Sequence, residues 1–297
     1  MTLRYSPQAE RSLRWWLLIN YEELLSKLID IVREGIVFVK GLAGKEEYVR
    51  KVRKHEFSSD VTRRFDEEAE KFLLDRIKSL GIDSLIITEE SGEVRFGGDP
   101  KLIYVIDPVD GSINFASNIP WSSISIAVAP YKEGALLDDV TLGIIGNIYT
   151  GDIYYFIKGH GCFENSRKVV KRGPPQKVIF GYFEGLDAYL IIPKYWSLRG
   201  KTKVRSLGCV SLDLVYVGLG RAECFIDVRA KLRNVDIAAA YGFIKECGGE
   251  VSHADGTPLS DVSINRLDRV YSLIASWDRE THEYLVRAYE LLQKDLR

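Results

Sequence analysis

The sequence is short of cysteine, histidine and methionine and carries almost no net charge, and each shortage excludes a class of protein. Its 297 residues include four cysteines, four histidines and one methionine, and the formal net charge is −1. This balance gives no reason to expect a surface for nucleic acid or for an anionic membrane. Without a C-x-x-C pair or metal-ligand spacing of histidines, a zinc site is not expected. The cysteines should be reduced, mostly buried thiols and not a disulfide framework: Cys162, Cys209, Cys224 and Cys247.

Long hydrophobic runs are also missing. The cluster Trp15-Trp16-Leu17-Leu18-Ile19 is followed by Glu22 and Glu23, too soon for a membrane span. No small-residue cleavage site follows the cluster, so we expect no signal peptide and a cytoplasmic protein. Apolar residues instead recur at three- and four-residue steps over 17–32. This spacing predicts an amphipathic helix that packs on a core.

The order of the predicted elements divides the chain into two parts. At 46% apolar and 28% charged residues the composition is that of a globular protein, and no repeat appears. Before Gly173-Pro-Pro175 the pattern is mixed α+β, and after it strands and helices alternate as in an α/β fold. We therefore predict subdomains 1–172 and 173–297. The first has a second helix at 66–80 and strands at 84–88, 102–106, 123–129, 140–149 and 152–158. The second has strands at 177–183, 223–228 and 270–275 and helices at 211–220, 234–247 and 279–296.

Acidic residues follow apolar segments at three separate places in the chain. They are Asp107 and Asp110 after the strand at 102–106, Glu89 and Glu90 after the strand at 84–88, and Asp236 in the first turn of the helix at 234–247. Ligands of α/β sheets gather beyond the carboxyl ends of the strands. We therefore expect the first two groups to converge on one crevice, which Asp236 can reach from the start of its helix.

Carboxylates brought together in this way need a cation, because like charges held close raise each other's pKa and cost stability. Oxygen ligands without histidine or cysteine select hard cations, Mg²⁺ above all. Two Mg²⁺ ions about 4 Å apart can activate a water and stabilise a leaving oxygen. Gly111-Ser112, before a helical turn, provides backbone N–H groups for a phosphate. The pattern favours metal-assisted chemistry on a phosphate.

Each acidic group also has a simpler explanation. The segment Asp107-Pro-Val-Asp-Gly alone is a good β-turn, and Glu89-Glu90 alone is a typical solvated strand end. Asp236 alone would stabilise its helix through the dipole by about 0.3–1 kcal/mol. Their recurrence after apolar segments of one chain is what favours a shared site.

With these residues assembled, the chain resembles the inositol monophosphatase superfamily of magnesium-dependent phosphomonoesterases. Three motifs carry the resemblance: Thr88-Glu-Glu-Ser91, the segment 107–115 with its D-P-[apolar]-D-G-[ST]-x-N-[FY] pattern, and Asp236-Ile-Ala-Ala239. Weaker agreements at 57–62, 159–165 and 255–259 extend it over about residues 15–295. The resemblance implies a layered α/β/α/β/α sandwich that forms a homodimer or a homotetramer.

The resemblance also assigns roles to residues of this chain. Two or three Mg²⁺ ions, for which Mn²⁺ can substitute, would be held by Glu89, Asp107, Asp110, Asp236 and the carbonyl of Val109. The catalytic residues would be Glu89, Ser112, which would position and help activate the water, and Asp60, which would support Ser112. The substrate would contact the amides of Gly111 and Ser112, the stretch Gly208-Cys209, and Asp227 in place of a ring-binding acid.

The stretch between Asp227 and Asp236 is longer and more basic than in dedicated inositol monophosphatases. In this it resembles archaeal-type members that act on fructose 1,6-bisphosphate as well as on inositol phosphates. Arg229, Lys231 and Arg233 would then bind a second phosphate, although each alone is also explained as a solvated basic strand end. We predict hydrolysis of fructose 1,6-bisphosphate, inositol 1-phosphate or both, by activated water that attacks phosphorus directly.

Three other functions stay open at this point. Hydrolysis of adenosine 3′,5′-bisphosphate is a sister activity on the same scaffold. A phosphatase of the haloacid dehalogenase type would need D-x-D, whereas Asp107 and Asp110 are three residues apart. A regulator that binds sugar phosphates or a partner without catalysis would be expected to lack a metal ligand. The expected partner of the predicted enzyme is a small sugar or polyol phosphate, neither nucleic acid nor membrane.

Overall fold

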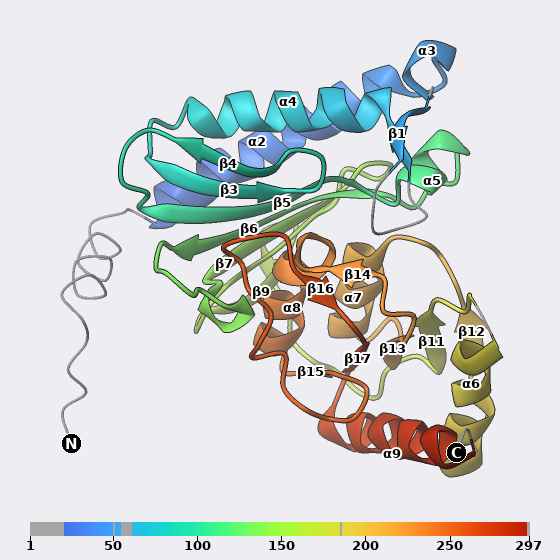
Figure 1. Cartoon of the computed structure of the whole chain (residues 1–297). Helices are drawn as coiled ribbons and strands as arrows, with labels where there is room; N and C mark the ends of the chain where they lie inside the picture. Colours follow the sequence, from blue (N-terminus) through green and yellow to red (C-terminus); the bar gives the residue numbers. More distant parts are fainter. Residues whose placement is uncertain (1–20, 50, 55–60, 185, 296–297) are drawn as a thin grey trace, which may run out of the picture.

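The computed structural model describes residues 21–49, 51–54, 61–184 and 186–295, and its core is two β-sheets with helices between and outside them (Figure 1). The eight-stranded sheet has the order β10-β9-β8-β7-β6-β5-β3-β4. Its strands β3 and β5 are parallel, and all other neighbours are antiparallel. The strands are β3 (Ser84–Thr88), β4 (Gly92–Phe96), β5 (Leu102–Asp110), β6 (Ser123–Pro130), β7 (Leu142–Asn147), β8 (Ile153–Ile157), β9 (Gly161–Glu164) and β10 (Arg167–Lys168).

The five-stranded sheet has the order β12-β11-β13-β17-β15 and is mixed. Strand β11 is parallel to β12 and to β13, whereas β17 runs antiparallel to β13 and β15. The parallel pairing that is typical of alternating strands and helices is therefore found only among β11, β12 and β13. The strands are β11 (Val178–Gly181), β12 (Lys203–Arg205), β13 (Cys224–Asp227), β15 (Glu250–Ser252) and β17 (Leu273–Ser276).

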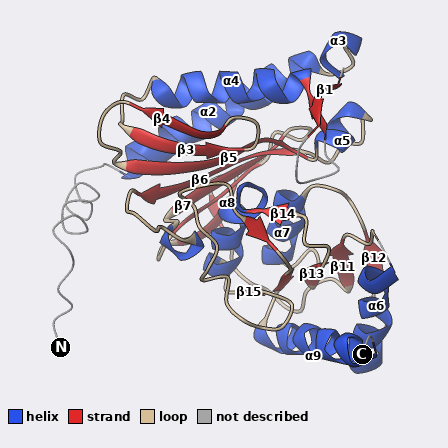
Figure 2. Ribbon diagram, viewed as in Figure 1, coloured by secondary structure: helices blue, strands red, loops and turns tan. Residues whose placement is uncertain are grey.

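Helices form three layers around these sheets (Figure 2). Helices α2 (Tyr21–Leu42) and α4 (Arg64–Lys78) cover the outer face of the eight-stranded sheet. Helices α7 (Val210–Gly218) and α8 (Asn234–Glu246) fill the space between the sheets. Helices α6 (Leu186–Arg199) and α9 (Arg279–Asp295) cover the far face of the five-stranded sheet. The short elements are α3 (Glu46–Val49), β1 (Lys51–Lys54), β2 (Val61–Arg63), α5 (Ser112–Ala116), η1 (Leu137–Asp139), β14 (Leu232–Arg233) and β16 (Arg269–Val270). The predicted α/β/α/β/α sandwich is confirmed.

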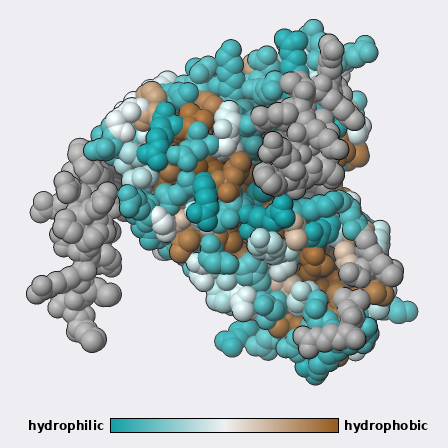
Figure 3. All heavy atoms as spheres, viewed as in Figure 1, coloured by the Kyte–Doolittle hydropathy of each residue, from teal (hydrophilic) through white to brown (hydrophobic). Residues whose placement is uncertain are grey.

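Strand β5 shows why its sequence is apolar throughout. Tyr104 and Ile106 pack in the cluster formed with α2 and α4, whereas Ile103 and Val105 pack in the cluster formed with α8. Side chains of a strand alternate between the two faces, so a strand between two helical layers buries every residue. On the exposed side of the amphipathic helices α4 and α9, by contrast, hydrophilic side chains cover the edges of the molecule seen in Figure 3.

Among the differences from the sequence-based expectation, a helix and a disulfide are the largest. Helix α6 was not predicted, because Pro193 lies inside it and proline usually ends a helix. The expectation of four reduced thiols was wrong. Cys162 of β9 and Cys247, directly after α8, form a disulfide, whereas Cys209 and Cys224 are free. The two bridged residues are 85 positions apart, so no local spacing in the sequence indicates the bond.

The connection between the sheets contains the predicted boundary at residues 172 and 173, which we keep as a proposal. None of the helices in the described ranges is long and apolar enough to cross a membrane.

Candidate active site

A bulge near the end of β5 turns two aspartates to the same face of the sheet. Asp107 pairs with Ser125 of β6 and Asp110 pairs with Ser123, so three steps along β5 oppose two along β6. In a regular strand, residues three apart point to opposite faces, and the one extra residue of a bulge returns them to one face. Pro108 lies within the bulge, where no ladder N–H is required. The bulge therefore makes the three-residue spacing suitable for a shared site.

The turn after β3 brings Glu89 to the cavity that these aspartates line. Glu70 of α4 holds this turn. Its Oε2 accepts hydrogen bonds from Thr88 Oγ1 at 2.8 Å, the Glu90 backbone N at 2.9 Å and the Ser91 backbone N at 3.3 Å, and its Oε1 accepts one from Ser91 Oγ. Sequence analysis missed Glu70, although an acidic residue beside the buried face of a predicted helix was the available signal.

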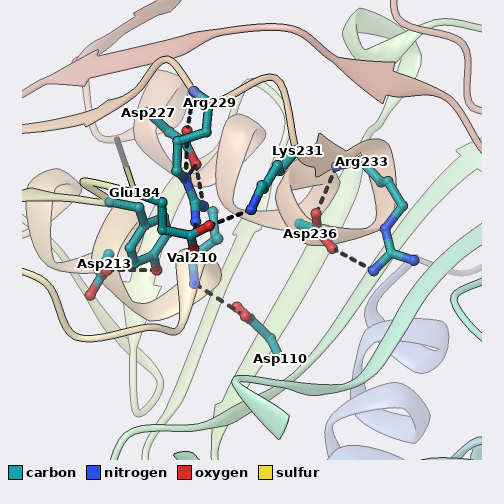
Figure 4. A network of polar contacts seen from close by, with 10 residues as sticks. Asp110, Glu184, Val210, Asp213, Asp227, Arg229, Lys231, Arg233 and Asp236 are labelled. Atoms are coloured by element: carbon teal, nitrogen blue, oxygen red, sulfur yellow. Dashed lines mark hydrogen bonds and ion pairs between the residues drawn. The ribbon is translucent and has the colours of Figure 1, made fainter. Parts of the chain in front are cut away.

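Arg233 and Asp236 enter the site from the start of α8. Asp236 Oδ2 accepts a hydrogen bond from the Arg233 backbone N at 2.7 Å, and Asp236 Oδ1 lies 3.6 Å from Arg233 Nη2 (Figure 4). The same guanidinium donates to Glu89 Oε1. Arg233 therefore joins the turn after β3 to the start of α8.

A cavity of about 320 Å³ collects the three acidic segments predicted to converge. Its lining includes Glu89, Asp107, Asp110, Asp236 and Val109 from the predicted metal-binding set, and Gly111, Ser112, Gly208, Arg229, Lys231 and Arg233 from the predicted substrate-binding set. The structure thus brings together residues from β5, α5, α8 and the segment before α7. Their individual roles remain predictions.

The buried carboxylates carry more negative charge than the adjacent cation compensates. Burial raises the pKa of Asp107 well above its usual range, and repulsion from Glu89, Asp110 and Asp236 raises it further. Burial also raises the pKa of Asp110 to about 6 and that of Asp236 to about 7. Arg233 is the cation that opposes the shifts at Asp107 and Asp236. Four carboxylates around one guanidinium leave a surplus that divalent cations would neutralise.

These side chains are engaged with protein groups. Arg233 bonds to Glu89, and Asp107 Oδ1 accepts a hydrogen bond from the Val109 backbone N at 3.0 Å. Accordingly, within the described ranges no three acidic, histidine or cysteine side chains are already arranged around one metal position. The donor chemistry still fits a hard cation, because the site offers oxygen atoms and uncompensated negative charge.

Asp110 connects the first sheet to α7. Its Oδ1 accepts a hydrogen bond from Val210 N at 3.1 Å, and its Oδ2 accepts bonds from Ser211 N at 2.5 Å and Cys209 Sγ at 3.3 Å. Backbone N–H groups of a first helical turn stabilise a carboxylate placed there. The Cys209 sulfur also contacts Ser123 Oγ at 3.2 Å. Burial raises the pKa of the Cys209 thiol, so the thiol is a poor nucleophile. Its hydrogen bond to Asp110 makes it a support for that carboxylate.

The turn at Gly111 packs tightly against the segment before α7. Gly111 has φ +82°, and a Cβ there would lie 3.0 Å from the carbonyl oxygens of Gly208 and Trp121. Asn114 ties the same parts together, because its Nδ2 donates to Trp121 O at 2.8 Å and to Leu207 O at 2.6 Å. A side chain at position 111 would force these two segments apart.

Two of the predicted site residues in the described part of the chain, Cys209 and Asp227, do not line this cavity. Asp60 lies outside the described residues. Cys209 is fully buried beneath Asp110, and Asp227 is 1% exposed with its carboxylate bonded to Arg229. Direct contact of Cys209 and Asp227 with a substrate, as predicted, is therefore not what the structure shows. Each instead contacts a residue that does line the cavity: Cys209 donates to Asp110, and Asp227 accepts from Arg229.

A test of the site concerns Glu70. Glu70→Gln is expected to lower the affinity for magnesium and to cost about 1–3 kcal/mol of stability, because its amide NH₂ would face hydrogen-bond donors in the turn that carries Glu89. Calorimetry with Mg²⁺ and thermal unfolding would measure the two effects. Glu67→Gln, an exposed acid of the same helix, is the control. Equal magnesium affinities in the two variants would contradict a role of Glu70 in positioning Glu89.

Comparison with known proteins gives the family of the chain. Residues 20–294 match the sequence profile described as the inositol monophosphatase family. The chain belongs to that family. Members are metal-dependent, and membership confirms the predicted enzyme class, a phosphoric monoester hydrolase.

Several relatives in this family are substantially similar. The inositol-1-monophosphatase of Aeropyrum pernix is 34% identical over 265 residues, which is 88% of this chain and 95% of that protein. The fructose-1,6-bisphosphatase/inositol-1-monophosphatase of Methanothermobacter thermautotrophicus is 34% identical over 245 residues, covering 78% and 84%. The bifunctional NADP phosphatase/NAD kinase of Methanococcus maripaludis is 28% identical over 82% of this chain but only 46% of that protein.

The fold agrees with solved structures of the family. A protein of Pyrococcus horikoshii, described as having similarities to inositol-1 monophosphatase, superposes with a TM-score of 0.72 at 26% identity. The match covers 90% of this chain and 98% of that one. The resemblance inferred from the three motifs is therefore confirmed.

Proposed function

We propose that this member of the inositol monophosphatase family is a magnesium-dependent phosphatase of sugar or polyol phosphates, with fructose 1,6-bisphosphate and inositol 1-phosphate as its substrates. The observation that carries the proposal is a single cavity lined by Glu89, Asp107, Asp110 and Asp236 and also by basic side chains. The relatives named for these two activities support the choice of substrates.

In this proposal, Glu89, Asp107, Asp110, Asp236 and the carbonyl of Val109 hold two or three Mg²⁺ ions, for which Mn²⁺ can substitute. Bound magnesium supplies a water of lowered pKa and neutralises charge on the leaving oxygen. If Glu89 held a cation, its hydrogen bond from Arg233 would be lost. The Arg233 guanidinium would then be available to a phosphate, which it can bind through two parallel hydrogen bonds.

The remaining residues orient the reactants. The hydroxyl group of Ser112 positions the attacking water, and the amides of Gly111 and Ser112 bind the phosphate that is removed. Gly111 has no Cβ, so its backbone can approach the phosphate while it packs on Gly208. Asn114 keeps the two segments in place through its bonds to Trp121 and Leu207.

Phosphate release from a panel of esters tests the proposal. The purified chain is expected to release inorganic phosphate from fructose 1,6-bisphosphate or inositol 1-phosphate with Mg²⁺ and to release none with EDTA. Release that persists after chelation would contradict the metal-dependent site. Binding of Mg²⁺ and of these esters without any turnover would instead support a regulator.

A nucleotide phosphatase is the second candidate, and the similarity to the NADP phosphatase of Methanococcus maripaludis favours including it. The same panel should therefore contain adenosine 3′,5′-bisphosphate and NADP. Faster release from either nucleotide than from the sugar and inositol esters would replace our first choice of substrate.

A further inference from the structure

The wall of the cavity formed by Glu184, Arg229 and Lys231 contains an ion-pair cluster that the proposed chemistry does not use. Glu184 Oε1 accepts a hydrogen bond from Arg229 Nη1, and Glu184 Oε2 accepts one from Lys231 Nζ (Figure 4). One carboxylate thus bridges two cations, each through its own oxygen. All three side chains line the same cavity as the buried carboxylates.

Arg229 itself is fixed by a second carboxylate. Asp227 Oδ2 accepts bonds from Arg229 Nη2 at 2.7 Å and Nε at 3.2 Å, and Asp227 Oδ1 accepts bonds from Arg229 Nε at 3.1 Å and the backbone N at 2.9 Å. The guanidinium lies over the ring of Tyr182, 4.5 Å from its centroid. The Tyr182 hydroxyl in turn donates to the buried Asp213 at 2.9 Å. Arg229 therefore keeps its position whether or not Glu184 stays bound.

Asp227 and Glu184 differ in how readily each can be displaced from Arg229. The side chain of Asp227 is 1% exposed, so removing its partner would leave a buried charge unpaired. The side chain of Glu184 is 55% exposed, and an exposed ion pair contributes only about 0–1 kcal/mol. An anion that binds to Arg229 and Lys231 would therefore displace Glu184 and leave Asp227 in place.

The occupant that replaces a bridging carboxylate must offer at least two acceptor oxygens and negative charge. A phosphate monoester does so, and arginine and lysine are the side chains that bind it best. The uncharged end of a polyol monophosphate lacks that charge, so it cannot replace the carboxylate on the two cations. The cluster therefore treats substrates with one and with two phosphates differently.

We propose that Glu184 is a specificity-determining residue, whose carboxylate occupies the Arg229–Lys231 pair until the second phosphate of a bisphosphate substrate displaces it. This inference rests on the proposed function. It adds that a carboxylate of the protein itself competes with the substrate's second phosphate for the two cations. Because a bisphosphate has to displace the Glu184 carboxylate and a monophosphate does not, Glu184 favours monophosphate substrates. Without its negative charge, the two cations are open to the second phosphate.

Kinetics with matched esters test this. Glu184→Gln is expected to raise the ratio of kcat/KM for fructose 1,6-bisphosphate to kcat/KM for fructose 1-phosphate about fivefold, mainly through a lower KM for the bisphosphate. The size follows from loss of an exposed ion pair worth up to about 1 kcal/mol. Lys231→Gln, which removes a cation, is expected to lower the same ratio. Glu280→Gln on α9 is the control, because it breaks an ion pair of an exposed carboxylate with Arg199 of α6, and neither residue lines the cavity.

An unchanged ratio in Glu184→Gln, or a ratio that moves equally in Glu280→Gln, would overturn the inference. Binding of fructose 1,6-bisphosphate in EDTA, measured by calorimetry, keeps it separate from the proposed function. If the unmodified protein releases phosphate from neither fructose ester nor from inositol 1-phosphate, the proposed function fails and calorimetry decides alone. Tighter binding by Glu184→Gln than by the unmodified protein would then support the role of Glu184, and equal binding would refute it.

Discussion

Replacing Asp107 with asparagine is expected to abolish phosphate release and at the same time to make the metal-free protein more stable. The carboxylate of Asp107 is buried beside Glu89, Asp110 and Asp236, all of which repel it. Asparagine has the same shape, and its oxygen can still accept the hydrogen bond from Val109 N. Relief of the repulsion should stabilise the protein in EDTA by about 1–3 kcal/mol. At about 2–4 °C per kcal/mol, that is a rise in Tm of several degrees.

Loss of activity in Asp107→Asn should be on the order of 10³-fold, the scale on which a single electrostatic contact at a reacting centre acts. Magnesium should raise the Tm of the unmodified protein and leave that of the variant almost unchanged, since a ligand stabilises only the state that binds it. Phosphate release and thermal unfolding with Mg²⁺ or EDTA measure both effects.

Asp213→Asn is the matched control for the effect on stability. Asp213 is as buried as Asp107, and burial raises its pKa too, but its oxygens accept hydrogen bonds from Trp121 Nε1 and the Tyr182 hydroxyl. An amide NH₂ would face one of these donors, so this variant should be less stable in EDTA. If Asp107→Asn were destabilised like Asp213→Asn and still bound magnesium as the unmodified protein does, crowding of charge would not be the basis of the site.

The sequence was sufficient for the sandwich through its resemblance to a known family, and for the convergence of the acidic segments through local patterns. Apolar strands that end in acids showed where the carboxyl ends of β3 and β5 lie. The bulge of β5 was not visible in that pattern, yet it is what turns Asp107 and Asp110 to one face. The strand was predicted to end at residue 106, whereas pairing with β6 continues to Asp110.

Contacts between distant segments could not be predicted from the sequence. Glu184 meets Lys231 across 47 positions, and Arg233 meets Glu89 across 144. Neither pair follows a spacing rule. Glu184 and Lys231 follow the neighbouring strands β11 and β13 of one sheet, whereas Arg233 meets Glu89 because the start of α8 packs against the eight-stranded sheet. Asp227 shows a different limit: the family resemblance suggested contact with a substrate, but the side chain is buried and its carboxylate binds the nearby Arg229.

Removing the disulfide is expected to cost the protein about 4.5 kcal/mol of stability. A bridge between Cys162 and Cys247 closes a loop of 85 residues, and loss of loop entropy in the unfolded chain gives this size. The double replacement Cys162→Ala/Cys247→Ala should therefore lower Tm by roughly 10 °C. Thermal unfolding without reductant is the measurement. Cys224→Ala, equally buried but unbridged, is the control and should show only the smaller cost of a lost sulfur.

Titration of thiols in the denatured protein checks the bond itself. Two thiols, those of Cys209 and Cys224, should react before reduction, and all four after it. Both bridged residues are buried, and their Cα atoms are 5.4 Å apart, within the range that a disulfide spans. The bond joins β9 of the first sheet to the end of α8, whose first turn carries Asp236. Four reactive thiols without reductant, together with a double variant as stable as Cys224→Ala, would show that packing alone holds α8 against the sheet.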